Sequence, residues 1–482
     1  MVRELFVSRL GGRLWTALRE DGATVEFRVE RHRRDAPVGR ILKARVTTIL
    51  PGIQSAFLDI GTERGGFLHA KDLVLPGEPA EHPPIEQRLS VGRDLLVQIS
   101  RERLRAKGPK VTCFLSIPGR FVVLLPQAGK SGVSRRIEEP EERERLSAIL
   151  GKLPGNGVGF VARTAARGVG EAEIRADAAG LMRTWCEIQD RAERLPAPSV
   201  VYREPGLLLR LLRELPHEDL QRVVLDDEED RNQALAYLRE ADPLLASRLE
   251  LHPGPVSLFQ ARGLHEEIEK ALRPRIWLHS GGTIVVEETE ALVSIDVNTG
   301  KFLGRGGPEE TALKTNLEAA REIARQLRLR DLGGIVVIDF IDMLQEENWT
   351  RVQQELEEHL KKDRSRTKIV GLSELGLLQL TRKRTQPTLG ALLERSCPLC
   401  AGHGRIPAPR TVAASALHEL RRAAAANEEG RFVVRAHPDL VGAIEVIVEE
   451  SEFAAKEGRE PRVRVRPDPS LPPHRFELDR TR

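Results

Sequence analysis

The sequence predicts a multidomain protein of mixed α/β and α+β class, and three observations support this. Its 482 residues are about three times the length of a typical domain. Short strand patterns separated by glycine and proline fill the first 113 residues, whereas residues 276–395 alternate strand and helix patterns. Hydrophobic residues make up 40 % of the chain, which is enough for several buried cores.

The N-terminal third is predicted to be all β. Residues 1–36 alternate like strands around turn signals at Gly11-Gly12 and Asp21-Gly22, which indicates a small antiparallel meander. Residues 37–113 contain about five short strands broken by Pro51-Gly52 and similar pairs. This spacing predicts a small closed barrel of the OB type.

The middle and the end of the chain combine strands with helices. Strand patterns in residues 114–204 surround a charged helical stretch, and residues 206–275 read as helical. A long helix is predicted to begin at Pro308, a favoured first-turn residue, and to end by Gly333. After a CPLCAGHGR segment, residues 408–482 are predicted to form helix, strand, helix and strand before a proline-rich tail.

Two apolar strand patterns, ALVSIDVNTG and GGIVVIDFIDM, end abruptly in acidic residues. Asp296 and Asp339 stand at these strand ends, and Asn298 lies on the same side of the chain as Asp296. If the strands are neighbours, the two carboxylates converge at one edge of a sheet. Mg²⁺ prefers such oxygen ligands and keeps several waters, and it serves phosphoryl transfer or hydrolysis.

A structural role is the alternative for these acids, since an aspartate at a strand end often caps the following turn. Asp342 is a weaker ligand candidate, because a spacing of three from Asp339 does not share one side of a strand.

Cys397 and Cys400 form a CxxC pair, which is half of a zinc site. Cys113 and Cys186 stand in apolar contexts typical of core residues. A structural zinc needs four ligands, so a second copy of the pair from another chain is the simplest completion. His403 as a third ligand and a redox CxxC are the alternatives, although the strand-then-helix context of a redox pair is missing.

Aromatic residues on the barrel are typical of nucleic-acid binding. Phe57 and Phe67 lie on barrel strands in a chain with only 4 % aromatic residues. OB folds stack the bases of single strands on such rings, and Lys107 is placed to supply charge for the backbone. The alternative is that both rings fill the barrel core.

Arginine pairs provide a second nucleic-acid signal. Arg135 and Arg136, and further on Arg163 with Thr164, are residue types that bind phosphate through guanidinium forks and a hydroxyl donor. Ion pairs with the acidic residues at 138–139 are the alternative, and the residues alone favour it.

The four cysteines and the absence of an apolar leader or spanning segment predict a cytoplasmic protein. Clustered arginine over a net charge of only +3 favours phosphate ligands more than membranes.

Taken together and in order over residues 1–407, these motifs closely resemble the bacterial ribonuclease E/G endoribonucleases. AFLDIG and GGFLH resemble the family's RNA-binding barrel, and KGPKVT, SGVSRRIE and ARTAA resemble its 5′-end sensor. GGTIVVEETEALVSIDVNTG, LKTNLEAA, GGIVVIDFIDM, LTRKR and CPLC resemble its catalytic domain and zinc link. The length implies a chain of the ribonuclease G branch, without a long disordered tail.

The resemblance implies a specific architecture. A split ribonuclease H-like domain (1–36 and 205–275) holds an OB-fold RNA-binding domain (37–113) and a 5′-sensor domain (114–204). A DNase I-like catalytic domain (276–395), a zinc link (396–407) and a small C-terminal α/β domain (408–482) follow.

The resemblance also implies roles for the site residues. Asp296 and Asp339 bind the catalytic Mg²⁺, with Asn298 positioning a water or an aspartate. The RNA-anchoring residues are Phe57, Phe67 and Lys107, and the 5′-monophosphate pocket contains Val123, Arg135, Arg163 and Thr164. Cys397 and Cys400 share Zn²⁺ between protomers of a homodimer or tetramer.

The expected function is therefore a Mg²⁺-dependent endoribonuclease that acts on single-stranded RNA, in rRNA and tRNA maturation and mRNA decay. Two departures from the family pattern are Glu374, where an arginine is typical, and the proline-rich insert at 76–90. The rival hypotheses are a non-catalytic RNA-binding scaffold and a phosphoesterase acting on DNA or small phosphoesters.

Overall fold

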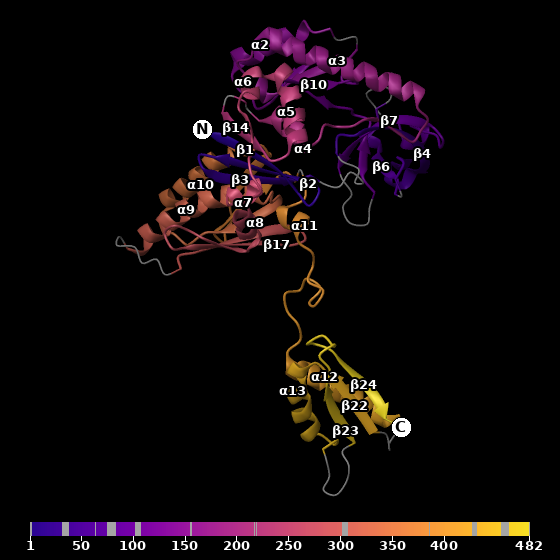
Figure 1. The fold of residues 1–482 in the computed structure, drawn as a ribbon, viewed down its shortest axis with the longest axis vertical. Coiled ribbons are helices and arrows are strands. Elements are labelled where there is room, and N and C mark those ends of the chain that lie inside the picture. Colours follow the sequence, from indigo (N-terminus) through magenta and orange to yellow (C-terminus); the bar gives the residue numbers. More distant parts are fainter. Residues whose placement is uncertain are drawn as a thin grey trace. The chain divides into compact units, whose positions relative to one another are not determined.

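The computed structural model describes two compact units, residues 1–392 and 393–482. It describes residues 2–30, 38–62, 64–74, 83–101, 108–154, 157–215, 217, 219–300, 307–384, 386–426, 431–454 and 462–481. Four sheets belong to the first unit and one to the second (Figure 1).

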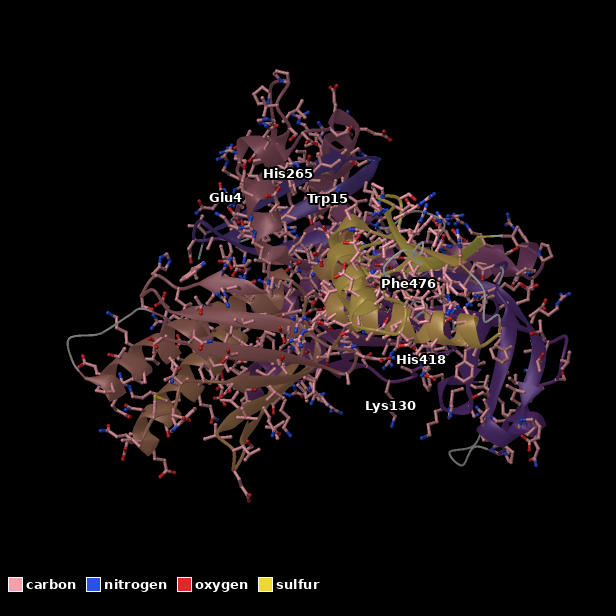
Figure 2. The ribbon with its side chains drawn as sticks, turned by 90° about the horizontal axis from the view of Figure 1, so that it is seen from below. Glu4, Trp15, Lys130, His265, His418 and Phe476 are labelled. Atoms are coloured by element: carbon pink, nitrogen blue, oxygen red, sulfur yellow. The ribbon has the colours of Figure 1, made fainter. Side chains whose placement is uncertain are left out.

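One five-stranded sheet unites the N-terminus with a much later segment, in the order β15-β14-β1-β2-β3. The predicted antiparallel meander is confirmed as β1 (Arg3–Leu10), β2 (Arg13–Glu20) and β3 (Ala23–Val29). Strand β14 (Leu220–Leu225) pairs in parallel with β1 and with β15 (Leu249–Leu251). The aromatic ring of Trp15 (Figure 2) meets that of Phe259 edge to face, at 6.5 Å between centroids.

The expectation that residues 206–275 are wholly helical is therefore wrong. The helices are α4 (Leu207–Glu214), α5 (Glu228–Ala241), α6 (Pro243–Ala246), α7 (Leu258–Ala261) and α8 (Leu264–Leu272). Between them lie β14 and β15, and Val223 and Val224 belong to the short buried run of β14. Such a short apolar run cannot be told from a buried helix segment by periodicity.

The predicted closed barrel is confirmed, with five strands in the order β4-β5-β6-β8-β7 and a closing pair between β4 and β7. The strands are β4 (Ile41–Leu50), β5 (Ser55–Asp59), β6 (Gly66–His69), β7 (Asp94–Arg101) and β8 (Lys110–Thr112). Helix α1 (Ile85–Arg88) buries Ile85 against the barrel core, and β13 (Ser199–Tyr202) pairs with β4.

A third, four-stranded sheet follows the barrel and packs on two helices. Its strands are β9 (Ile117–Pro118), β10 (Val122–Leu125), β11 (Gly132–Val133) and β12 (Gly159–Ala162), and its helices are α2 (Pro140–Gly151) and α3 (Glu171–Arg194). The charged helical stretch predicted within residues 114–204 is thus α2.

The fourth sheet has six strands in the order β16-β17-β18-β19-β21-β20. They are β16 (Arg275–Trp277), β17 (Thr283–Glu288), β18 (Leu292–Asn298), β19 (Gly334–Asp339), β20 (Thr367–Leu372) and β21 (Leu377–Arg382). The predicted long helix is α9 (Pro308–Leu329), which packs with α10 (Glu346–Leu360) against one face of the sheet; α11 (Leu389–Leu393) comes after β21. Alternate residues of β18 and β19, such as Ile295 and Ile338, are buried beneath these helices, so the intervening residues face the other way.

The second unit contains a three-stranded sheet in the order β23-β22-β24. Its elements are α12 (Pro409–Ala425), β22 (Arg431–Ala436), α13 (Pro438–Glu449), β23 (Val463–Pro467) and β24 (Phe476–Thr481). The expected proline-rich tail is a strand from Phe476 onward, because Phe476 and Leu478 point into the core between charged residues.

Within the described residues, no helix combines the length and apolar character needed to cross a bilayer. The boundaries and fold-family names of the predicted domains remain predictions.

Candidate active site and RNA-binding surfaces

The two acid-ended strands are direct neighbours, which meets the condition set by the sequence argument. Strand β18 pairs in parallel with β19, and Asp296 stands in register with Asp339. Both side chains are exposed on the face of the sheet that α9 and α10 leave uncovered. Because paired strands lie about 4.8 Å apart, the carboxylates project side by side.

The surroundings of this acidic pair fit a divalent cation better than a turn cap. Asn298 Nδ2 donates to Asp296 Oδ2 at 2.7 Å, and no backbone N–H among the described residues donates to either carboxylate. In the described part of the chain, no Lys, Arg or His side chain forms an ion pair with either aspartate. Two carboxylates with open positions match the preference of Mg²⁺ for few protein oxygens and several waters. No third carboxylate, histidine or cysteine in the described ranges completes a protein-only metal cage.

Helix α9 holds the loop that follows Asp339. The buried Asn316 receives the backbone N–H of Ile341 at 3.0 Å and donates to its carbonyl at 2.8 Å. Glu309, in the first turn of α9, accepts from the backbone N–H groups of Leu344 and Gln345. These contacts fix the loop after Asp339 to the helix that covers the other face of the sheet.

Two glycine turns position the end of β18. A Cβ atom on Gly282 would lie 2.8 Å from the carbonyl oxygen of Asn298, and one on Gly300 would lie 2.5 Å from that of Gly281. Gly300 also has a positive φ of +61°. The turn before β17 therefore packs directly on the residues that follow Asp296, which explains the GGT and NTG motifs.

The barrel phenylalanines do not fill the barrel core, which excludes the alternative to an RNA-binding role. Phe57 pairs with Phe67 across β5 and β6, and their ring centroids are 5.8 Å apart. Leu58 and Leu68, which follow them, are fully buried in the barrel. Phe57 is 37 % exposed, so the two rings form an accessible aromatic surface. Lys107 lies outside the described residues.

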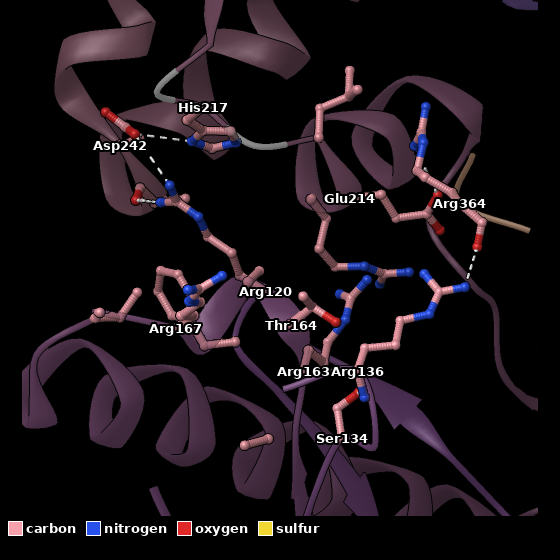
Figure 3. Close-up of a pocket in the computed structure, with 18 of the residues that line it drawn as sticks. Arg120, Ser134, Arg136, Arg163, Thr164, Arg167, Glu214, His217, Asp242 and Arg364 are labelled. Carbon is pink, nitrogen blue, oxygen red and sulfur yellow. Dashed lines mark hydrogen bonds and ion pairs between the residues drawn. The ribbon is translucent and has the colours of Figure 1, made fainter. Parts of the chain in front are cut away.

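A basic pocket of about 1590 Å³ contains most of the predicted phosphate-binding residues. Its lining includes residues from the four-stranded third sheet, from β1 and β2 of the five-stranded sheet and from the segment after α10 (Figure 3). Its Arg and Lys residues are Arg3, Arg120, Arg136, Arg163, Arg167, Arg213, Arg328, Lys361, Lys362 and Arg364. Its Asp and Glu residues are Glu20, Glu173, Glu214, Asp242 and Asp363.

Hydrogen bonds to two backbone carbonyls hold Arg163 in this pocket. Its backbone N–H donates to the carbonyl of Phe121, and its guanidinium donates to the carbonyl of Gly119. Burial lowers the pKa of Arg163, although arginine remains charged in proteins. Asp177 on α3 accepts from the backbone N–H groups of residues 120–122 and so fixes this turn.

Thr164 and Val123 also line the pocket, but Arg135 does not. Arg136 takes that place, and its guanidinium donates to the carbonyl of Arg364 at 2.8 Å. The expected ion pairs of this arginine pair are absent among the described residues, since Glu139 pairs with Arg167 instead. Arg135 and Arg136 lie together on a turn, and the phosphate-binding role of Arg135 stays a prediction.

The CxxC segment has the features of a zinc-binding turn. The backbone N–H of Gly404 donates to Cys400 Sγ at 3.3 Å. This hydrogen bond and one from the backbone of Gly402 lower the pKa of the Cys400 thiol. Such donors favour the thiolate that binds zinc. Within the described chain no third ligand joins the pair, so His403 is not placed as one. Cys113 is buried as expected, whereas Cys186 is exposed on α3, which corrects its prediction as a core residue.

Comparison with known proteins places the chain among ribonucleases. A family model described as the ribonuclease E/G family matches residues 116–385. Ribonuclease G of Escherichia coli strain K12 is 37 % identical over 479 residues, which cover 97 % of this chain and 98 % of that protein. Ribonuclease G of Haemophilus influenzae is 39 % identical over 430 residues, or 88 % of each chain. Ribonuclease E of E. coli is 37 % identical over 76 % of this chain but only 35 % of its own length.

The chain therefore belongs to the ribonuclease E/G family. Within that family it is similar over nearly its whole length to ribonuclease G, which confirms the resemblance found in its motifs.

Proposed function

We propose that this protein cleaves single-stranded RNA at the Asp296–Asp339 pair with the help of Mg²⁺. Its family membership makes it an endoribonuclease of RNA processing. The observation that carries the finer proposal is the register of the two strands, which places two carboxylates side by side on an open sheet face.

The residues at this site have distinct tasks. Asp296 and Asp339 would hold Mg²⁺, which when bound supplies water activation and Lewis-acid stabilisation of the phosphodiester. Asn298 holds the Asp296 carboxylate in one orientation through its amide. The exposed position of the pair allows a long polymer to cross it, and the products would carry 5′-phosphate and 3′-hydroxyl ends.

The aromatic surface supports the choice of single-stranded RNA. Unpaired bases present both faces for stacking, and Phe57 with Phe67 offers an accessible pair of rings. We infer that Lys107 contributes to the same RNA contact.

The basic pocket supports a preference for 5′-monophosphorylated RNA. Arg163 and Thr164 would bind the terminal phosphate, because a guanidinium fork and a hydroxyl are both donors to its oxygens. Val123 lines the same pocket, whereas Arg135, which the family resemblance assigns to this role, is not among the lining residues.

Zinc shared by two copies of Cys397 and Cys400 would join protomers into a homodimer or tetramer. The two-thiol count and the lowered pKa of Cys400 support this assembly. The physiological role that we propose is maturation of rRNA and tRNA together with mRNA decay.

The test uses a single-stranded RNA with either a 5′-monophosphate or a 5′-triphosphate, and a DNA of the same sequence, each with and without Mg²⁺. We expect Mg²⁺-dependent cleavage of RNA, faster with the monophosphate. Asp339→Asn should lose roughly a hundredfold or more, since even indirect metal partners cost 10–100-fold. Asp342→Asn is the matched control and should cleave normally.

The rival hypotheses predict different results. RNA binding without cleavage by the wild type, or equal activity of Asp339→Asn, identifies a binding scaffold or another site. Equal cleavage of DNA and RNA identifies a general phosphoesterase.

A further inference from the structure

We propose that the basic pocket also binds the internucleotide phosphates that follow the 5′ end of the RNA, through Lys361, Lys362 and Arg136. This proposal rests on the proposed function and extends it, because it makes the pocket a subsite for the first few nucleotides. The terminal-phosphate residues Arg163 and Thr164 form only part of its lining.

The size of the pocket supports this extension. Its volume is about 1590 Å³, which exceeds the roughly 300–1,000 Å³ typical of a site for a drug-sized ligand. A terminal phosphate alone would leave most of this volume to solvent. The pocket therefore has room for nucleotides that continue from the phosphate bound at Arg163.

The cations that lack an acidic partner supply the second argument. Lys361 and Lys362 are exposed at the end of α10, and in the described part of the chain no acid pairs with them. Arg136 contacts a backbone carbonyl, and no carboxylate of a described residue pairs with it. Figure 3 shows Arg136 in the same half of the pocket as Arg163 and Arg364.

Most of the acids in the pocket are already neutralised. Glu20 is ion-paired with Arg3 and Arg328, and Asp242 with Arg120. Asp363 and Glu214 are likewise paired with arginines. Glu173, exposed in the first turn of α3, is the unpaired acid among the described lining residues.

The unpaired cations, Arg136, Arg163, Lys361 and Lys362, thus outnumber the unpaired acids. Such an excess attracts a polyanion, and consecutive phosphates of one strand present charges at regular intervals along it.

Ion pairs hold the segment that contains Lys361 and Lys362 in place, so it can act as a binding surface. Asp363, directly after Lys362, pairs with the buried Arg382 of β21 at 2.6 Å. Arg364 pairs with Glu26 of β3 at 2.8 Å. These two anchors fix the segment directly after the pocket-lining lysines, which themselves follow the end of α10.

The test measures RNA binding by the full-length Asp339→Asn protein, in which cleavage is suppressed, and by the same protein carrying Lys361→Gln and Lys362→Gln. The ligand is a 5′-monophosphorylated single-stranded RNA, and its affinity is measured by fluorescence anisotropy. The titration is repeated over roughly one decade of salt concentration, from about 0.1 to about 1 M. Lys270→Gln on α8, an exposed lysine that does not line the pocket, is the matched control.

We expect the double lysine variant to reduce the slope of log affinity against log salt by about 1.4, since each single-strand phosphate contact contributes about 0.7. Over that decade of salt the difference amounts to a roughly 25-fold loss of affinity at the low end. An RNA whose first internucleotide linkages are neutral methylphosphonates should bind both proteins equally.

An unchanged salt slope in the lysine variant, or the same loss with neutral linkages, overturns the proposal. The proposed function fails by a different result, namely the absence of Mg²⁺-dependent RNA cleavage by the wild type. A loss of preference for the monophosphate in Arg163→Gln, with no effect of the lysine changes, keeps the terminal-phosphate role and removes the extended subsite.

Discussion

Replacing Arg382 with methionine should strongly destabilise the first unit. The Arg382 side chain is 3 % exposed and pairs at 2.6 Å with both Asp363 and Asp331, whose side chains are 4 % and 12 % exposed. It also donates to the carbonyl of Leu332, just before β19. One side chain thus connects β21, the start of β19 and the segment that follows Lys361 and Lys362 of the basic pocket.

The magnitude follows from what the substitution leaves behind. Removing one partner of a buried ion pair costs about 3–5 kcal/mol, because the remaining charge has no compensation. Burial already raises the pKa of Asp331 while Arg382 counteracts it, so without the arginine this carboxyl should take up a proton more readily. The loss of stability should therefore be larger at pH 8 than at pH 5.

Urea unfolding followed by tryptophan fluorescence measures this loss. The four tryptophans, Trp15, Trp185, Trp277 and Trp349, all belong to the first unit, so the signal reports on that unit. With a urea slope of about 3 kcal/mol per molar, the midpoint should fall by roughly 1–2 M.

Arg384→Met is the matched control for this measurement. Arg384 is exposed and donates to the carbonyl of Gly333, so its loss should cost about 1 kcal/mol. An Arg382→Met midpoint equal to that of the wild type or of Arg384→Met refutes the reasoning.

Three further predictions concern pH, RNA anchoring and assembly. Burial opposes ionisation of Glu26, but Arg28 and Arg364 outweigh it and lower the pKa from 4.5 to about 2. The ionised Glu26 therefore contributes roughly 3 kcal/mol to the free energy of unfolding, at about 1.4 kcal/mol per pKa unit. This contribution is present above pH 4.5 and lost as pH falls towards 2. Glu26→Gln should flatten the acid limb of the plot of urea midpoint against pH, and an unchanged limb contradicts this. Phe57→Ala should weaken RNA binding by about 1–3 kcal/mol, whereas Phe57→Tyr keeps the ring and should bind normally; equal affinities of the two variants argue against stacking. Cys397→Ser should lower both the bound zinc and the mass in solution, and an oligomer of unchanged mass without zinc speaks against the shared site.

The sequence predicted the acidic site because its signals are local. Each strand shows a short apolar run with an acid at its end, and one parallel pairing suffices to bring Asp296 and Asp339 together. The barrel was predictable for a similar reason, since glycine and proline mark its turns. Whether the Phe57 side chain points into or out of the barrel was not predictable. Its neighbours Ala56 and Leu58 are also apolar, so no alternation of polar and apolar residues marks the outer face there.

The pocket was only half predictable. Arg163 and Thr164 were found from a compact motif, but Lys361 and Lys362 come from a segment about two hundred positions away in the sequence. Nothing in that segment indicates a phosphate ligand, because exposed lysines at a helix end usually face solvent. The strand β14 was missed for a different reason, since its short apolar run fits helix and strand equally well.

The Mg²⁺ dependence of RNA cleavage tests the central claim most directly. The rate on a 5′-monophosphorylated single-stranded RNA should be measured against Mg²⁺ concentration for the wild type, Asp339→Asn and Asp342→Asn. We expect Asp339→Asn to require more Mg²⁺ and to remain roughly a hundredfold or more slower at saturation, while Asp342→Asn follows the wild type. An Asp339→Asn curve that coincides with the wild-type curve would contradict the assignment of the Asp296–Asp339 pair as the catalytic site.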